Sequence, residues 1–443
     1  MKPFQPREFY ATEWCWQDPV CHRRIERLME GFGRPLNSLR VVREDELEGL
    51  IRAKSWLETW RRQGYNGFSG DPDLVFNRFR WLDSASVASL RKRYPVLQEG
   101  RDFAGSMVQA LYGLAPSFHF EDGVHKRTRN QNCCWSLYDL HTGWGCLHKC
   151  KYCQRGRVMT LMLNLEEWLV KVDDLLAKAP WQKTIRYDVE TDCLPVEPEY
   201  GACRMLVEHF ARLPDRYLIL FSKSDNVDFL LDLEHRGHTI MLWTLSTSTV
   251  SRRIEVDTAT TAQRIEAARK CQQAGYPVRF KLKPIIPVKN WREEATRMFE
   301  QLFAAVRPDN LSMEMLFFRS VEELKAMFGG ELDPDFVRLM ERAQASGQPW
   351  EEYRPVPEDF RVEVYEFYAA AVRRLSPGTP LSLCAESPTV WARLAPLLGQ
   401  AADDFICNCG PACVPNLRPG AMAARQDWVQ EVAGRDVAAS PRP

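Results

Sequence analysis

The stretch GWGCLHKCKYCQRG, residues 143–156, decides the fold of this chain. It sets Cys146, Cys150 and Cys153 in a Cys-x3-Cys-x2-Cys pattern, with Tyr152 just before the last cysteine. Three thiolates this close in sequence can surround one inorganic cluster. Iron–sulfur cubanes normally take four thiolates, so three ligands would leave one iron open to a substrate or cofactor.

The same loop allows a second interpretation, a structural zinc site. Zinc would need a fourth ligand. No second Cys-x2-Cys or His-x3-His pair lies nearby, so that ligand would have to be His141 or His148. Disulfides are not favoured, since 14 cysteines in 443 residues are too sparse for a disulfide scaffold. We therefore interpret the clustered cysteines as metal or redox ligands.

Composition narrows the class of protein further. Hydrophobic residues make up 45% and charged residues 27%, as in ordinary globular proteins. Lysine plus arginine and aspartate plus glutamate both number 59, so no net charge attracts the chain to nucleic acid or anionic lipid. We find no run of about 18 apolar residues and no signal-peptide pattern at the start. The expectation is a cytoplasmic protein with no membrane partner.

Downstream of the cysteine loop, apolar β-branched runs alternate with amphipathic helical patterns. A first helix, with Asn164 as its expected cap, should end at Pro180. Strands are then expected at residues 184–190, 217–223, 239–246, 278–286 and 311–318, and helices at 199–213, 226–235, 261–274 and 292–306. Such β-α units predict a parallel sheet with its active site at the carboxyl ends of the strands.

This combination resembles the radical S-adenosylmethionine enzymes, whose signature is the same cysteine pattern with an aromatic residue beside the last cysteine. Within them, a little under half of the chain is most similar to spore photoproduct lyase, through LFSK at 220–223, VDFLL at 227–231, RIEAA at 264–268 and AGYP at 274–277. The resemblance implies an α/β fold, a partial (β/α)6 TIM-type barrel. It also implies a [4Fe-4S] cluster on Cys146, Cys150 and Cys153 that binds S-adenosylmethionine.

The resemblance assigns further residues near the cofactor. Lys223 matches a lysine that contacts S-adenosylmethionine in the lyase, and Thr244 matches a serine that also contacts it. Tyr152 is expected to bind the cofactor as well. A lysine suits the cofactor carboxylate, and a hydroxyl suits a ribose oxygen.

The match departs from the lyase at the second strand. The lyase carries a hydrogen-donating cysteine a few residues before an aspartate that corresponds to Asp192, whereas here Cys193 follows it. Hydrogen transfer needs near-contact geometry, so this shift argues against repair of thymine dimers. Candidate catalytic residues are Cys193 as a redox-active thiol, with Glu190 and Asp192 to orient a polar substrate or the cofactor amine.

A second group of cysteines lies near the end of the chain. Cys407, Cys409 and Cys413 stand within seven residues, beside Gly410. Cys384, after a strand-like run, is the natural fourth ligand. Four thiolates would suit an auxiliary iron–sulfur cluster or a zinc ion.

These patterns predict four regions. Residues 1–130 form an N-terminal, mainly helical cap, and residues 131–320 form the radical S-adenosylmethionine partial barrel. Residues 321–417 form an extension with the auxiliary metal site, and residues 418–443 form a tail.

The predicted function is reductive cleavage of S-adenosylmethionine to a 5′-deoxyadenosyl radical. That radical would abstract hydrogen from a peptide, a natural-product precursor or a small metabolite, with flavodoxin or ferredoxin as reductant. One alternative is a spore photoproduct lyase-like repair lyase, although the charge balance disfavours a nucleic-acid partner. The other is a non-catalytic zinc-binding interaction protein.

Overall fold

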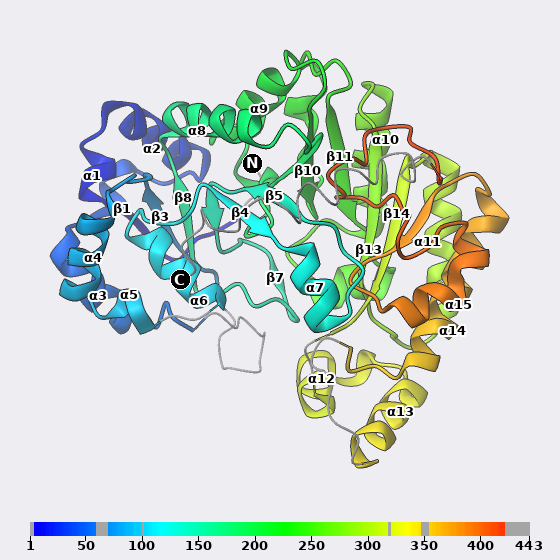
Figure 1. Ribbon diagram of the computed structural model, residues 1–443. Coiled ribbons are helices and arrows are strands. Elements are labelled where there is room, and N and C mark those ends of the chain that lie inside the picture. The colour runs from blue at the N-terminus through cyan, green and yellow to red at the C-terminus, as the bar shows by residue number, and fades with distance from the viewer. Residues whose placement is uncertain (1–3, 59–69, 100–101, 318–319, 347–353, 421–443) are drawn as a thin grey trace.

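A long sheet forms the centre of the protein in a computed structural model that describes residues 4–58, 70–99, 102–317, 320–346 and 354–420 (Figure 1). Its strand order is β15-β14-β13-β11-β10-β9-β5-β4, and neighbours run parallel except β4 with β5. The strands are β4 (Phe118–Glu121), β5 (Leu137–Leu140), β9 (Thr184–Tyr187), β10 (Tyr217–Ser222), β11 (Thr239–Thr244), β13 (Val278–Ile285), β14 (Asn310–Met315) and β15 (Leu381–Leu383). The strands expected from the sequence are thereby confirmed.

Helices connect most of the successive parallel strands. They are α8 (Leu165–Lys178), α9 (Ala202–Phe210), α10 (Thr261–Gln273) and α11 (Trp291–Ala305), followed by α14 (Glu358–Leu375) and α15 (Pro388–Leu398). Helix α11 packs against α10 and α14, and α14 packs against α15. In α8 the buried side chains recur every three or four residues, as an amphipathic helix requires.

The helix expected at residues 226–235 is wrong. The structure has only a 3-10 turn, Asp228–Leu230, in this connection. The side-chain amide of Asn226 donates 2.8 Å hydrogen bonds to the carbonyls of Leu194 and Glu197, which ties the chain to a neighbouring loop. The segment therefore follows that loop and does not wind into a helix.

The expected cap of α8 is also different. Asn164 precedes the helix but makes no capping bond to its backbone. Its side chain accepts a hydrogen bond from the backbone of Phe79 at 2.8 Å and donates one to Glu167 at 2.8 Å. Asn164 thus joins the start of α8 to the N-terminal part of the chain.

The N-terminal part contains a sheet that the sequence did not predict, parallel except where β6 pairs with β8. Its strand order is β2-β1-β3-β8-β6, and β3 lies parallel to β8, which comes from beyond the cysteine loop. The strands are β1 (Phe9–Thr12), β2 (Leu39–Val42), β3 (Asp73–Asn77), β6 (Gly143–Trp144) and β8 (Val158–Met162). Because β6 and β8 belong to residues 131–320, the expected boundary at residue 130 falls within one hydrogen-bonded unit.

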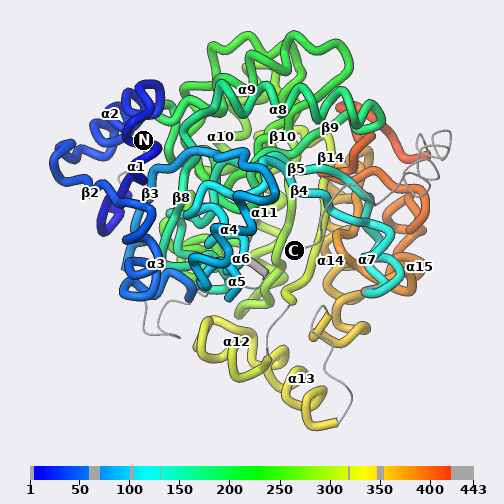
Figure 2. Tube along the Cα trace, turned by 60° about the vertical axis from the view of Figure 1, so that its left-hand side comes forward, coloured from blue at the N-terminus to red at the C-terminus, as the bar shows by residue number. Residues whose placement is uncertain are grey.

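Helices make up much of this N-terminal part, as expected. They are α1 (Glu13–Trp16), α2 (Pro19–Gly31), α3 (Glu44–Ala53), α4 (Ser84–Arg93), α5 (Val96–Glu99), α6 (Asp102–Leu111) and α7 (Gly123–Asn130). Helices α12 (Val321–Phe328) and α13 (Pro334–Ala345) stand apart from the other helices at one end of the molecule in both views (Figures 1 and 2). The expected tail at residues 418–443 lies almost entirely outside the described residues.

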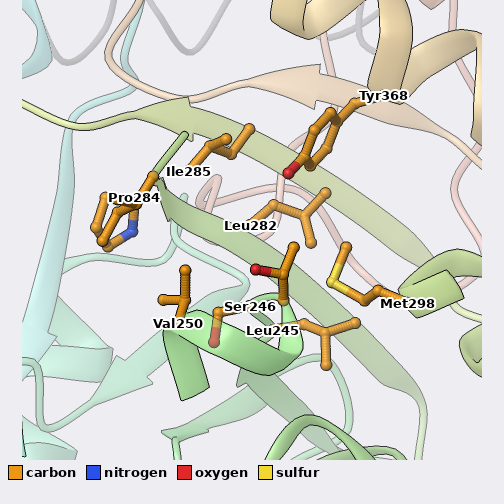
Figure 3. A pocket seen from close by; sticks show the side chains of 10 residues that line it. Leu245, Ser246, Val250, Leu282, Pro284, Ile285, Met298 and Tyr368 are labelled. Carbon is orange, nitrogen blue, oxygen red and sulfur yellow. The ribbon is translucent and has the colours of Figure 1, made fainter. Parts of the chain in front are cut away.

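One small cavity can be set aside as a ligand site. It lies between β11, β13 and α14, beside Leu282, Met298 and Tyr368 (Figure 3). Its volume of about 10 Å³ is close to that of a single water molecule. Among the described residues, no helix is long and apolar enough to cross a membrane.

Candidate active site

A cavity of about 450 Å³ lies on the concave side of the long sheet, and we call it the sheet cavity. All eight strands contribute to its wall, from Glu121 on β4 to Leu383 on β15. In a flat sheet, strands spaced about 4.8 Å apart would place these two edges roughly 34 Å from each other. The sheet must therefore curve strongly around the cavity, although β4 and β15 do not pair to close it.

The cysteine loop enters the sheet cavity at the carboxyl ends of the strands. Tyr152 and Cys153 line the cavity, while Cys146 and Cys150 lie behind them with 9% and 6% of their surface exposed. The backbone N–H of Arg155 donates to the Cys153 sulfur at 3.4 Å.

The cysteine loop is anchored by a short antiparallel ladder. Strand β7 (Lys149–Cys150) pairs with β12 (Glu255–Val256), which places Cys150 opposite Glu255. The ammonium of Lys149 lies 2.7 Å from Asp71 and 2.8 Å from Asp257. Backbone pairing and charge together hold the loop against the sheet.

Gly145 is required where the loop turns toward its first cysteine. Its φ of +87° is in the region that favours glycine, and a Cβ there would lie 2.2 Å from the carbonyl oxygen of Val158. No side chain fits at this point. Gly145 therefore allows the loop to pass directly over β8.

Glu255 is a central residue of the site that the sequence analysis missed. It is fully buried and contacts Arg264 at 2.7 Å, Ser246 at 2.7 Å and the hydroxyl of Tyr152. Burial alone would raise its pKa, but the charges of Arg264 and Lys223 and these hydrogen bonds hold the pKa at about 2. The only sequence signal was one acidic residue between Ile254 and Val256.

Lys223 and Thr244 lie at the carboxyl ends of two neighbouring strands. Lys223 follows β10, and its ammonium is 3.8 Å from Glu255 and 6.0 Å from the centre of the Tyr152 ring. Thr244 ends β11, and its buried hydroxyl has no hydrogen-bond partner in the described part of the chain. Both residues line the sheet cavity. A buried hydroxyl without a partner suits a ligand oxygen.

The three candidate catalytic residues have different surroundings. Glu190 lines the sheet cavity and pairs with Arg155 at 2.5 Å. Asp192 bonds to His148 at 3.0 Å and accepts from the backbone N–H of Lys223 at 2.7 Å. Burial opposes ionisation of Asp192, but these bonds lower its pKa.

Cys193 does not line the sheet cavity. It is 2% exposed, and its thiol contacts that of Cys203 on α9. The thiol also points toward the carbonyl of Phe221 at 3.9 Å. This surrounding is that of a packed core cysteine.

Cysteines near the end of the chain also line the sheet cavity. Cys384, Cys407 and Cys409 line it, and Cys413 lies next to them with 1% of its surface exposed. Cys134 lines the same region and was missed, because it lies in a segment without periodicity. The sequence gives no sign that residue 134 is near residue 384.

Among the charged side chains that line the sheet cavity, basic ones outnumber acidic ones. Most are paired: Lys126 with Glu121, Arg155 with Glu190, Arg186 with Asp139, Lys223 with Glu255 and Lys283 with Glu314. Lys281 makes no ion pair within the described residues, and its ammonium lies 5.6 Å from the Phe221 ring centre. It is 3% exposed. The cavity therefore favours anionic groups.

The residues of the cysteine loop fit an iron–sulfur cluster. Their donors are thiols, the ligands that such clusters take, and three of them leave an open iron. Over the described ranges, no three His, Cys, Asp or Glu side chains are arranged around a single ion. Ligands of a cubane bind separate irons, so they stand further apart than the ligands of one zinc ion.

Comparison with known proteins agrees with this geometry. Residues 123–330 match the family model "Spore photoproduct lyase". The spore photoproduct lyase of Bacillus subtilis (strain 168) is 28% identical over 198 residues, which is 42% of this chain and 58% of that protein. The lyase of Clostridium acetobutylicum is 24% identical over 211 residues, 46% of this chain and 63% of that protein. The chain thus spans less than two thirds of either relative.

A solved spore photoproduct lyase, complexed with dinucleoside spore photoproduct, has a similar fold. It superposes with a TM-score of 0.56 at 16% identity and covers 86% of this chain and 99% of that chain. In sequence match, fold and cysteine loop, the chain is similar to the radical S-adenosylmethionine enzymes. Among them, it is spore photoproduct lyase-like over residues 123–330.

Proposed function

We propose that the protein is a radical S-adenosylmethionine enzyme with its substrate in the sheet cavity. One observation carries the proposal: Cys153 of the cysteine loop faces the same cavity as Lys223 and the unpartnered hydroxyl of Thr244. Cys146, Cys150 and Cys153 would hold a [4Fe-4S] cluster. When bound, the cluster and S-adenosylmethionine supply a 5′-deoxyadenosyl radical that takes a hydrogen atom from the substrate.

The side chains around the cavity would position the cofactor. Lys223 would bind its carboxylate, and the hydroxyl of Thr244 would bind a ribose oxygen. Tyr152 contacts Glu255, which keeps the aromatic ring packed beside the third cysteine. The curved open sheet serves as the partial barrel of this class, and the N-terminal unit serves as its cap.

Asp192 and Glu190 would have separate tasks. Asp192 is a positioning residue, because it joins His148 of the cysteine loop to the backbone of Lys223. Glu190, held by Arg155 at the cavity wall, would orient a polar substrate group. Cys193, buried away from the cavity, would contribute to packing.

The experiment is anaerobic reconstitution with iron and sulfide, followed by addition of S-adenosylmethionine and dithionite. Wild type should form 5′-deoxyadenosine, Cys146→Ala should not, and Cys271→Ser, which changes a buried thiol of α10, should resemble wild type. Flavodoxin or ferredoxin should replace dithionite. Absence of deoxyadenosine from wild type, with zinc bound to the purified protein, would favour the zinc-binding interaction protein.

A second candidate is a repair lyase that acts on spore photoproduct. The match of residues 123–330 to the lyase family favours it. The reconstituted enzyme should then convert dinucleoside spore photoproduct, and its affinity for DNA should fall steeply with salt. Deoxyadenosine formation without conversion would instead favour a peptide, a natural-product precursor or a small metabolite.

A further inference from the structure

Five cysteines from three separate segments lie in or next to the wall of the sheet cavity, and the C-terminal loop closes one end of it. Cys407, Cys409 and Cys413 belong to the C-terminal loop, Cys384 follows β15, and Cys134 precedes β5. Four of the five line the cavity. None of them takes part in the function proposed above.

The C-terminal loop is shaped so that its thiols gather. The backbone N–H of Cys407 donates to the Cys413 sulfur at 3.3 Å, and the thiol of Cys407 contacts those of Cys409 and Cys413. A Cβ at Gly410 would lie 2.5 Å from the Cys413 sulfur and 3.1 Å from that of Cys407. Glycine at this position therefore leaves the space that the sulfur atoms fill.

The sheet holds this loop rigidly. Backbone N–H groups of Lys183 and Thr184 donate to the carbonyl of Pro411 at 2.6 and 3.0 Å. The buried guanidinium of Arg279 donates to the carbonyl of Cys413 at 2.7 Å. The three thiols are thus presented by a fixed backbone.

Cys384 and Cys134 belong to two other segments of the cavity wall. The N–H of Cys384 bonds to the carbonyl of Met313 at 2.8 Å, which extends the pairing of β15. The N–H of Cys133 bonds to the carbonyl of Glu386 at 2.9 Å, so residue 134 runs beside residues 384–386. Cys134, which lies close enough to Cys409 for their charges to interact, and Cys384 beside it are the two candidates for a fourth ligand.

A buried cation accompanies these thiols. Lys281 lines the same cavity and makes no ion pair in the part of the chain that the structure describes. A cluster held by four thiolates is an anion, and a buried anion needs a nearby positive charge. The uncompensated ammonium of Lys281 meets that need.

We propose that this end of the sheet cavity binds a second iron–sulfur cluster, held by Cys407, Cys409 and Cys413 together with Cys134 or Cys384. Each ligating thiol loses its proton to solvent and forms a bond to iron. A zinc ion is the other occupant that four thiolates take, and the metal analysis below distinguishes the two.

The test is metal analysis of the full chain after anaerobic reconstitution, independent of activity. Wild type should hold about eight iron atoms, because each cubane contains four. The variant Cys146→Ala/Cys150→Ala/Cys153→Ala should keep about four, and Cys407→Ser/Cys409→Ser/Cys413→Ser should also keep about four. Cys271→Ser is the matched control and should bind as much iron as wild type.

The first triple variant separates this proposal from the proposed function, since it reports on the second site alone. Its failure to bind iron, or binding of zinc in place of iron, would overturn the second cluster whatever wild type does with S-adenosylmethionine. Mössbauer spectra of the wild-type protein that show only one cluster would also overturn the proposal, and they need no substitution. Iron lost from Cys134→Ser or from Cys384→Ser identifies the fourth ligand.

Discussion

Substitution of Glu255 by glutamine should destabilise the protein through loss of one buried charge. Glu255 and Arg264 are both fully buried and 2.7 Å apart, so the variant leaves the guanidinium without its counter-ion. The pKa of Glu255 lies at about 2 instead of the ordinary 4.5. At 1.36 kcal/mol per pH unit this corresponds to about 3 kcal/mol, similar to the cost of breaking a buried pair.

The pH dependence of the free energy of unfolding provides a second test of the Glu255–Arg264 pair. The folded-state pKa is lower than the unfolded value, so the stabilisation is complete above about pH 4.5 and is lost as pH falls toward 2. Urea unfolding of the apo protein should therefore show a gap between wild type and Glu255→Gln that is full at neutral pH and shrinks below about pH 4.5.

Glu266→Gln is the matched control. Glu266 pairs with Arg269 on the surface of α10, where an ion pair contributes little to the free energy of unfolding. Its urea midpoint should equal that of wild type at every pH. A Glu255→Gln variant as stable as wild type at neutral pH, or a gap that does not change with pH, would refute the reasoning.

Three further outcomes follow from the site. Gly145→Ala should lower the free energy of unfolding, measured with urea, by several times the roughly 1 kcal/mol expected for Gly237→Ala. Both glycines have a positive φ, but only a Cβ at Gly145 would meet the backbone of Val158. Equal losses in the two variants would contradict this close approach. Thr244→Val should weaken S-adenosylmethionine binding about five-fold in equilibrium dialysis, and Thr244→Ser should restore it; unchanged affinity in the valine variant would remove Thr244 from the cofactor site. The Cys193→Ser variant should produce as much deoxyadenosine as wild type in the anaerobic assay, since the Cys193 thiol lies outside the cavity. If a folded variant produced none, Cys193 would be a catalytic residue after all.

Local patterns predicted the long sheet well. Its parallel strands after the cysteine loop are rich in β-branched or apolar residues, and helices such as α10 and α11 have buried faces at helical spacing. In these elements local preference and tertiary burial agree. Residues 226–235 show the opposite case, because the tertiary bonds of Asn226 override a helical pattern.

Long-range pairing was not visible in the sequence. Strand β3 finds its partner β8 some 85 residues later, and both strands are only five residues long. Cys134 and Glu255 were missed for the same reason, since each acquires its contacts from neighbours distant in the chain. Lys223, Thr244 and the cysteine loop could be proposed from the sequence because their motifs are local.

The hydrogen bonds of the C-terminal loop also determine when the cavity is complete. Residues 407–413 bond to the first residues of β9 and to Arg279 near the start of β13, although they are made more than a hundred residues later. During synthesis, the sheet can form while this end is still open. The last described part of the chain then closes it, so a nascent chain that stops before Asn408 would expose the cavity interior to solvent and to any agent that delivers iron and sulfide.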